Sequence, residues 1–98
     1  WSDWRFIQAE KVYYAELEVL QAAAGQLADM LESHPSPVAA QILAERISKH
    51  TASGDPSLAI AREALAVSAL HVRDWAAGTL DRDAAVQSLQ TTFDLLQP

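Results

Sequence analysis

Hydrophobic residues recur along the chain at intervals of three and four positions, the spacing that places side chains on one face of an α-helix. This spacing runs through four segments, and it predicts helices at residues 3–33, 37–51, 56–77 and 82–96. No segment alternates hydrophobic and polar residues with β-branched side chains, so we expect no strands. The pattern therefore predicts an all-α protein.

The breaks between these helices carry residues that start or end helices. Ser36 precedes Pro37, and Asp55 precedes Pro56. Each pair places a capping oxygen before a proline at the first helical position, where the missing N–H of proline costs nothing. Gly78 suits the left-handed conformation at which many helices end. The breaks therefore support the four expected boundaries.

Short connections between the expected helices predict that successive helices are antiparallel neighbours. The chain has 98 residues, of which 50% are hydrophobic and 20% are charged. This is enough hydrophobic material for one core. We expect a single helical domain over residues 1–98, an antiparallel four-helix bundle-like fold with a long first helix.

The hydrophobic face of the first helix contains one carboxylate. The residues expected to face the core are Phe6, Ala9, Val12, Tyr13, Leu17, Val19, Leu20, Ala23, Ala24, Leu27, Met30 and Leu31. Glu16 falls in the middle of this set, and a carboxylate inside a core must be paired or protonated. We expect Glu16 to form a salt bridge with an arginine of another helix or to lie at the edge of a groove. The alternative is a ligand-binding or general-base role.

Large hydrophobic residues also occur on the polar side of the first helix. Trp4, Ile7 and Tyr14 cluster there, and Trp1 adds to them. Exposed aromatic residues that gather in one place often anchor protein interfaces. The alternative is that Trp4 and Ile7 fold over the end of the bundle as a lid. The sequence leaves both interpretations open.

The third helix is hydrophobic around nearly its whole circumference. One stripe, expected to face the core, contains Leu58, Ala61, Leu65, Val72, Trp75 and Ala76. Ile60, Ala64 and Val67 form a second stripe, and Leu70 points away from both. A member of a four-helix bundle keeps one open side. Either this helix is central in an irregular bundle, or a second copy or partner protein covers its outer stripe; we favour the second interpretation.

The second and fourth helices are expected to be ordinary amphipathic helices. The residues expected on the core side of the second helix are Val38, Ala39, Ile42, Leu43 and Ile47. Those of the fourth helix are Ala85, Val86, Leu89, Phe93 and Leu96.

The charge distribution narrows the classes of partner. Thirteen acidic and seven basic residues give a formal net charge of −6, and the basic residues are scattered. Nucleic acid repels such a surface, so we expect no nucleic-acid binding. The chain has no cysteine and therefore no disulfide or thiolate chemistry.

No hydrophobic run approaches the roughly 18 residues of a membrane span, so we expect no membrane insertion. No basic segment followed by a hydrophobic one opens the chain as a leader would. Because the chain begins at Trp1 without Met, we expect a trimmed product, an excised domain or a protein whose leader is missing. A cytoplasmic location is the default expectation, with the periplasm left open.

The residue types used in catalysis and metal binding are present but not in known arrangements. His71 and Asp74 form an i, i+3 pair, whereas His34 and His50 lie near helix ends. Neither His-Glu-x-x-His nor the repeated Glu-x-x-His of di-iron bundles is present. We therefore expect no metal, no cofactor and no enzymatic activity.

The expected function is that of a small non-enzymatic regulatory protein, a homodimer that binds and controls another protein. Antiactivators, chaperones and immunity proteins are examples of this class. The residues expected to bind partners are Trp1, Trp4, Ile7, Tyr14, Ile60, Val67 and Leu70. The alternative is a ligand-sensing helical domain of a larger transcription regulator or receptor, with Glu16, Tyr13 and Trp75 lining a pocket.

Overall fold

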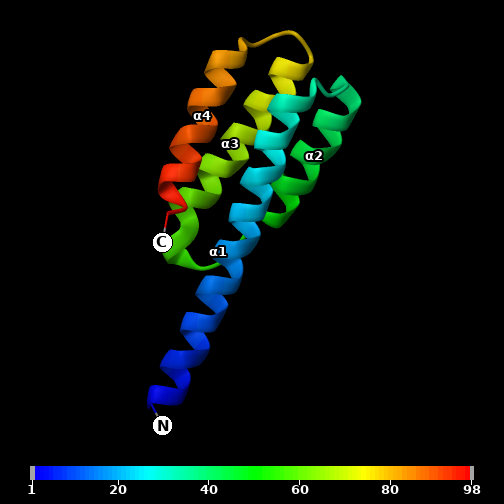
Figure 1. Cartoon of the computed structure of the whole chain (residues 1–98). Helices are drawn as coiled ribbons and strands as arrows, with labels where there is room; N and C mark the ends of the chain where they lie inside the picture. Colours follow the sequence, from blue (N-terminus) through cyan, green and yellow to red (C-terminus); the bar gives the residue numbers. More distant parts are fainter. Residues whose placement is uncertain (1, 98) are drawn as a thin grey trace.

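The computed structural model describes the backbone of residues 2–97 and the side chains of residues 9–97. Its elements are α1 (Ser2–Ser33), α2 (Pro37–His50), the short 3-10 helix η1 (Pro56–Leu58), α3 (Ala59–Ala76) and α4 (Arg82–Leu95). The four α-helices run alternately in opposite directions (Figure 1). Within residues 2–97 there is no β-strand. The all-α, four-helix bundle-like fold with a long first helix is confirmed.

The helix ends follow the expected capping chemistry. The Ser36 side chain accepts a hydrogen bond from the Ala39 N–H at 3.2 Å, which caps α2. The Asp55 carboxylate accepts one from the Ser57 N–H at 2.9 Å, which caps η1. Gly78 has a φ of 84°, in the left-handed region, and ends the α3 segment. These local signals explain why the observed boundaries lie within one residue of the expected ones.

The central helix of the bundle is α3. It packs against α1, α2 and α4, and α1 also packs against α4. By contrast, α1 and α2 do not pack closely against each other along their described lengths. The two helices border the same two hollows, so they are adjacent but contact each other less closely than the other successive helices do. The buried residues of α1 form one narrow stripe that α3 and α4 cover, so little of α1 is left for α2.

The core lies on the inner faces of all four helices. Its buried hydrophobic residues include Leu20, Leu27, Leu31, Ala44, Ile47, Leu58, Leu65, Ala69, Val72, Ala85, Leu89 and Leu96. Six of the expected core residues are instead exposed, namely Ala9, Val12, Val19, Val38, Ala39 and Ile42. The core faces of α1 and α2 are narrower than the sequence indicated, because α2 packs mainly against α3 and the N-terminal part of α1 extends beyond the bundle (Figure 1).

The N-terminal part of α1 projects beyond the bundle. The molecule measures 54 × 22 × 19 Å along its principal axes, and the blue end of α1 extends alone from its lower end (Figure 1). Leu17 is the first buried residue of α1 among the described side chains. The α1 backbone continues away from the bundle over residues 2–8 (Figure 1). The side chains of Trp1, Trp4 and Ile7 lie outside the described residues.

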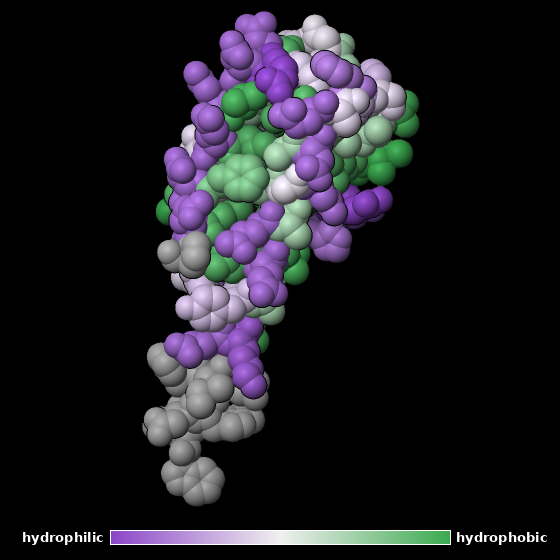
Figure 2. All heavy atoms as spheres, viewed as in Figure 1, coloured by the Kyte–Doolittle hydropathy of each residue, from purple (hydrophilic) through white to green (hydrophobic). Residues whose placement is uncertain are grey.

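The seam between α1 and α4 is visible on the molecular surface. Hydrophobic side chains appear along it between hydrophilic ones (Figure 2). Its lining includes Leu31 and Ala28 from α1 and Val86, Leu89 and Phe93 from α4. Because most of these side chains are buried or half-buried, the seam belongs to the core.

Candidate functional site

The outer face of α3 carries large hydrophobic side chains that the rest of the described chain leaves substantially exposed. Ile60, Val67 and Leu70 are 70%, 46% and 42% exposed. The opposite face of α3 is fully used by the core, since Leu65 and Val72 are almost completely buried. Although α3 lies at the centre of the bundle, its neighbouring helices therefore leave some of its hydrophobic residues exposed. Partner binding by these three residues stays a prediction.

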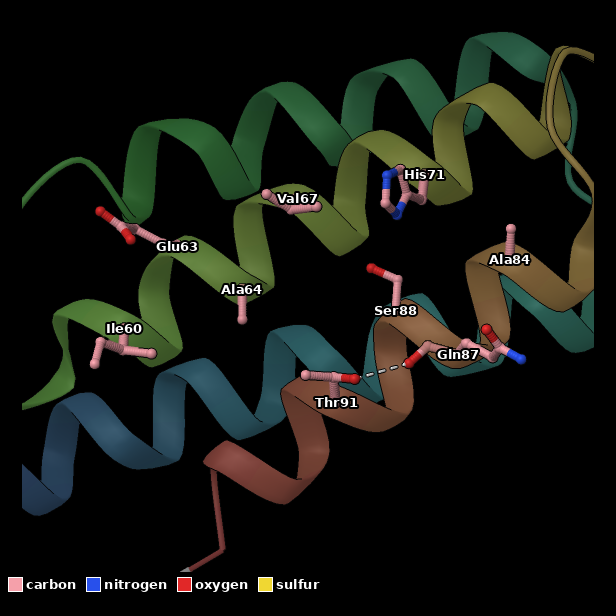
Figure 3. Close-up of a pocket in the computed structure, with 9 residues that line it drawn as sticks. All are labelled: Ile60, Glu63, Ala64, Val67, His71, Ala84, Gln87, Ser88 and Thr91. Atoms are coloured by element: carbon pink, nitrogen blue, oxygen red, sulfur yellow. Dashed lines mark hydrogen bonds between the residues drawn. The ribbon is translucent and has the colours of Figure 1, made fainter.

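A groove runs between the outer faces of α3 and α4 (Figure 3). Its volume is about 560 Å³. The residues that line it are Ile60, Glu63, Ala64, Val67 and His71 from α3 and Ala84, Gln87, Ser88 and Thr91 from α4. Ala64, Ala84 and Ser88 have small side chains, so a helix or loop of another protein could approach the groove closely. Two of the three exposed residues of α3, Ile60 and Val67, form one of its walls.

His71 contributes the one unusual polar group of this groove. Its Nδ1 atom is buried and has no hydrogen-bond partner among the described residues. The Asp74 carboxylate, which the sequence places one turn away, instead pairs with Arg73 at 3.0 Å. The i, i+3 pair of His71 and Asp74 therefore does not form. A buried polar atom without a partner is unfavourable by about 1–3 kcal/mol.

Three hydroxyl groups join α3 to α4 beneath the groove. The Ser68 and Thr92 hydroxyls are hydrogen-bonded at 2.7 Å, and the Ser68 hydroxyl also donates to the Ser88 carbonyl at 3.0 Å. Ser68 and Thr92 are fully buried. Sequence reasoning missed this cluster, because serine and threonine at these positions look like ordinary surface residues until the two helices are paired. The cluster fixes how α3 and α4 face each other.

Glu16 forms the salt bridge that the sequence predicted. Its carboxylate lies 3.2 Å from Nη1 of Arg62 on α3. It also accepts hydrogen bonds from the Asp55 N–H, the shorter at 3.1 Å, while Arg62 Nη1 donates to the Asp55 carbonyl at 2.7 Å. A Cβ at Gly54 would overlap the Glu16 carboxylate. Glu16 therefore ties α1 to the loop before η1 and to Arg62 of α3.

The residues of the alternative ligand pocket do not come together. Glu16 contacts Arg62 near the start of α3, whereas Trp75 lies near the end of α3, where its ring is 6.4 Å from that of His34. Thirteen residues of helix separate Arg62 from Trp75, which is about 20 Å at 1.5 Å per residue. Glu16 and Trp75 therefore lie at opposite ends of the bundle and cannot line one small pocket.

Tyr14 is the remaining predicted interface residue with a described side chain. It is exposed on the projecting part of α1, and its ring makes an edge-to-face contact with Tyr13 at a centroid distance of 5.2 Å. It lies on a different element from the α3 residues. The structure therefore does not bring all of the predicted interface residues into one surface.

No group of three or more histidine, cysteine, aspartate or glutamate side chains among the described residues is placed to hold a metal ion. None of the helices in this part of the chain combines the length and the hydrophobic run needed to cross a bilayer.

No protein-family model matches the chain, and no curated protein or solved structure matches it either.

Proposed function

We propose that this chain is a non-enzymatic interaction protein that binds another protein along the outer face of α3 and thereby controls it. The observation that carries the proposal is the exposure of Ile60, Val67 and Leu70 on a helix whose other face is fully packed. Large hydrophobic side chains gathered on one surface beside a groove are typical of binding sites.

The groove between α3 and α4 favours a helix as the bound element. Amphipathic helices commonly bind in hydrophobic grooves, where their hydrophobic residues act as anchors. Ala64 and Ser88 leave room for such anchors, and Val67 supplies the hydrophobic wall.

The charge of the molecule favours a basic partner. The formal net charge is −6, and Glu63 lies at the groove itself. Complementary charge accelerates association and disfavours acidic competitors. We therefore expect the bound segment to be a helix with one hydrophobic face and lysine or arginine residues beside it.

Site-specific photo-crosslinking in the cells that produce the protein tests this proposal. A crosslinking amino acid at Val67 should give a discrete adduct with one protein, whereas the same amino acid at Glu45, exposed on α2, should not. A second substitution, Ile60→Asp, should remove the adduct, because it places a charge in the hydrophobic contact. The matched control is Val38→Asp on α2. The proposal is wrong if positions 67 and 45 give the same adducts.

A further inference from the structure

The outer face of α1 carries a second unpartnered stripe. Val12, Ala15, Val19, Ala22, Gln26 and Asp29 follow one another at intervals of three and four residues, and all six are exposed. Val12 and Val19 are 62% and 55% exposed. Intervals of three and four residues keep a stripe facing one partner helix. The bundle covers the other side of α1, so among the described residues this stripe is open to a partner from outside the chain.

The stripe is self-complementary about Leu17. In an antiparallel pair of identical helices centred there, Val12 of one copy meets Ala22 of the other. In the same register, Ala15 meets Val19. Each contact therefore sets a branched side chain against a small one, which allows close packing.

The same symmetry extends to the polar ends of the stripe. Gln26 would be opposite Gln8, and Asp29 opposite Arg5. The Gln8 and Arg5 side chains lie outside the described residues, so these two pairings come from sequence position alone. Both pairings are complementary, the first by hydrogen bonding and the second by charge.

The gap between α1 and α2 supplies the place for the second helix. Two adjoining hollows of about 240 and 490 Å³ lie between these helices and share Gln26 and Arg46. Leu20 and Leu65 lie at the lining of the first hollow, and Leu43 at that of the second. The hollows form one groove along the outer side of the bundle, with a hydrophobic lining and one arginine midway.

The groove and the projecting end of α1 match in length and position. Residues 2–14 form about 20 Å of helix, and the 14 residues of α2 form about 21 Å. Pairing centred on Leu17 places residues 2–14 of one copy along residues 20–32 of the other. This is the part of α1 that borders the groove. The projecting end therefore fits the groove of a second copy in the register that the stripe requires.

The composition of the projecting end agrees with burial in a partner. Five of the seven aromatic residues of the chain fall within its first 14 positions, and they are Trp1, Trp4, Phe6, Tyr13 and Tyr14. Aromatic residues are enriched at the centres of protein interfaces. The charges of this segment, Asp3, Arg5, Glu10 and Lys11, cancel, whereas the whole chain carries −6. Two acidic copies can therefore join through it with little repulsion.

We propose that two copies of the chain form a symmetric dimer through antiparallel α1 helices, each copy inserting its projecting end into the α1–α2 groove of the other. This deepens the proposed function, since it assigns the homodimer contact to α1. The groove lining residue Leu65 and the exposed Val67 lie on different sides of α3. The dimer therefore leaves the α3–α4 groove free for the controlled protein.

Sedimentation velocity on the purified full chain tests the dimer. Val19→Glu is expected to weaken dimerisation at least about a hundredfold, because it removes two buried valines and sets two charges near the symmetry axis. Val38→Glu, an equally exposed valine change on α2 outside the groove, should leave the dimer intact. Unchanged helical circular dichroism shows that each variant is folded. A wild-type monomer at 100 μM, or equal behaviour of the two variants, overturns the proposal.

Cysteine pairing tests the register, since the chain has no cysteine of its own. A mixture of Val12→Cys and Ala22→Cys proteins should form a disulfide-linked heterodimer, whereas neither variant alone should form one efficiently. Self-crosslinking of Val12→Cys alone indicates parallel pairing and contradicts the proposal.

A further variant separates this proposal from the proposed function. Val67→Glu should keep the dimer and lose the photo-crosslinked partner, whereas Val19→Glu should lose the dimer. A monomeric wild type that still crosslinks through position 67 refutes the α1 dimer alone. A dimer with no adduct at position 67 refutes the α3 interface alone.

Discussion

At the scale of single residues, one carboxylate joins three segments at the lower end of the bundle. Glu16 on α1 holds Arg62 of α3 and the backbone N–H of Asp55. The arginine is only 9% exposed, so it depends on this partner for its charge. Its position explains why α1 keeps a carboxylate in the middle of a hydrophobic face.

Removal of this carboxylate should destabilise the fold strongly. Glu16→Ala leaves the Arg62 charge buried without its ionic partner, which is expected to lower the free energy of unfolding by about 2–4 kcal/mol. Glu16→Gln should lower it less, because the amide oxygen still accepts hydrogen bonds. Urea denaturation measures the stability of both variants. The matched control is Glu18→Ala, since Glu18 is exposed on the same helix. Equal stabilities of Glu16→Ala and Glu18→Ala would show that the salt bridge contributes nothing.

A methyl group at Gly54 should act through the same carboxylate. The added Cβ of Gly54→Ala would overlap the Glu16 carboxylate and displace it from Arg62. We expect a loss of stability close to that of Glu16→Ala, and little further loss when the two substitutions are combined. Additive losses in thermal unfolding would contradict this coupling.

The Asp55 side chain should make stability depend on acid pH. Hydrogen bonds from the Ser57 hydroxyl and the Ser57 N–H hold the pKa of the Asp55 carboxyl below its usual 3.8. The unfolded chain therefore binds this proton first, and the contribution of the carboxylate is present above pH 3.8 and lost as the pH falls through the lowered pKa. The difference in Tm between wild type and Asp55→Asn should shrink below pH 3.8. A difference that stays constant from pH 6 to pH 2 would contradict this assignment.

At the scale of elements, paired hydroxyl groups set the contact between α3 and α4. Ser68 and Thr92 are buried and hydrogen-bonded to each other, and each hydroxyl also lies within hydrogen-bonding distance of the Ser88 carbonyl. A buried hydroxyl left without a partner is unfavourable, whereas replacement of both partners by hydrophobic groups of similar shape is nearly neutral. The α3–α4 groove lies above this contact, so its shape depends on the pair.

The two hydroxyls should therefore show strong coupling. Ser68→Ala and Thr92→Val are each expected to lower the free energy of unfolding by about 1 kcal/mol, because each removes the hydrogen bond between the two hydroxyls, while the remaining hydroxyl keeps the Ser88 carbonyl as a partner. The double variant should be clearly more stable than the sum of the two losses predicts. Urea denaturation of the wild type, the two single variants and the double variant measures this coupling. Strictly additive losses of stability would show that the two hydroxyls act independently.

The helices themselves were predictable from local signals. The caps at Ser36 and Asp55 and the left-handed Gly78 act within a few residues, and so their effect can be read from the sequence. The salt bridge of Glu16 was also predictable in kind, because a carboxylate on a hydrophobic face needs a partner. Its partners Arg62 and Asp55 were not, since they are 46 and 39 residues away.

The width of each core face was not predictable. Val12, Val19, Val38 and Ile42 follow helical spacing, yet they are exposed. Spacing shows which residues share a side of a helix, but only the arrangement of neighbours decides how much of that side is covered. Because α1 and α2 contact each other only sparsely, Val19 lies beside an open groove between them.

At the scale of the whole molecule, two hydrophobic surfaces lie on different sides of a closed core. One is the outer face of α3 with Ile60, Val67 and Leu70, and the other is the stripe of α1 with Val12 and Val19. Burial of three such side chains contributes roughly 1.5–3 kcal/mol each before the costs of association. A protein that carries both surfaces can form a dimer through one and bind the controlled protein through the other.

The most direct measurement is the accessibility of position 67 inside cells. Because the chain has no cysteine, Val67→Cys and Glu45→Cys each provide a single thiol, and its maleimide labelling rate can be compared between intact cells and the purified protein. We expect the cysteine at position 67 to react at least about tenfold more slowly in cells than in the purified protein. The cysteine at position 45 should react at nearly the same rate in both. Equal labelling of position 67 in both settings would mean that no protein covers α3.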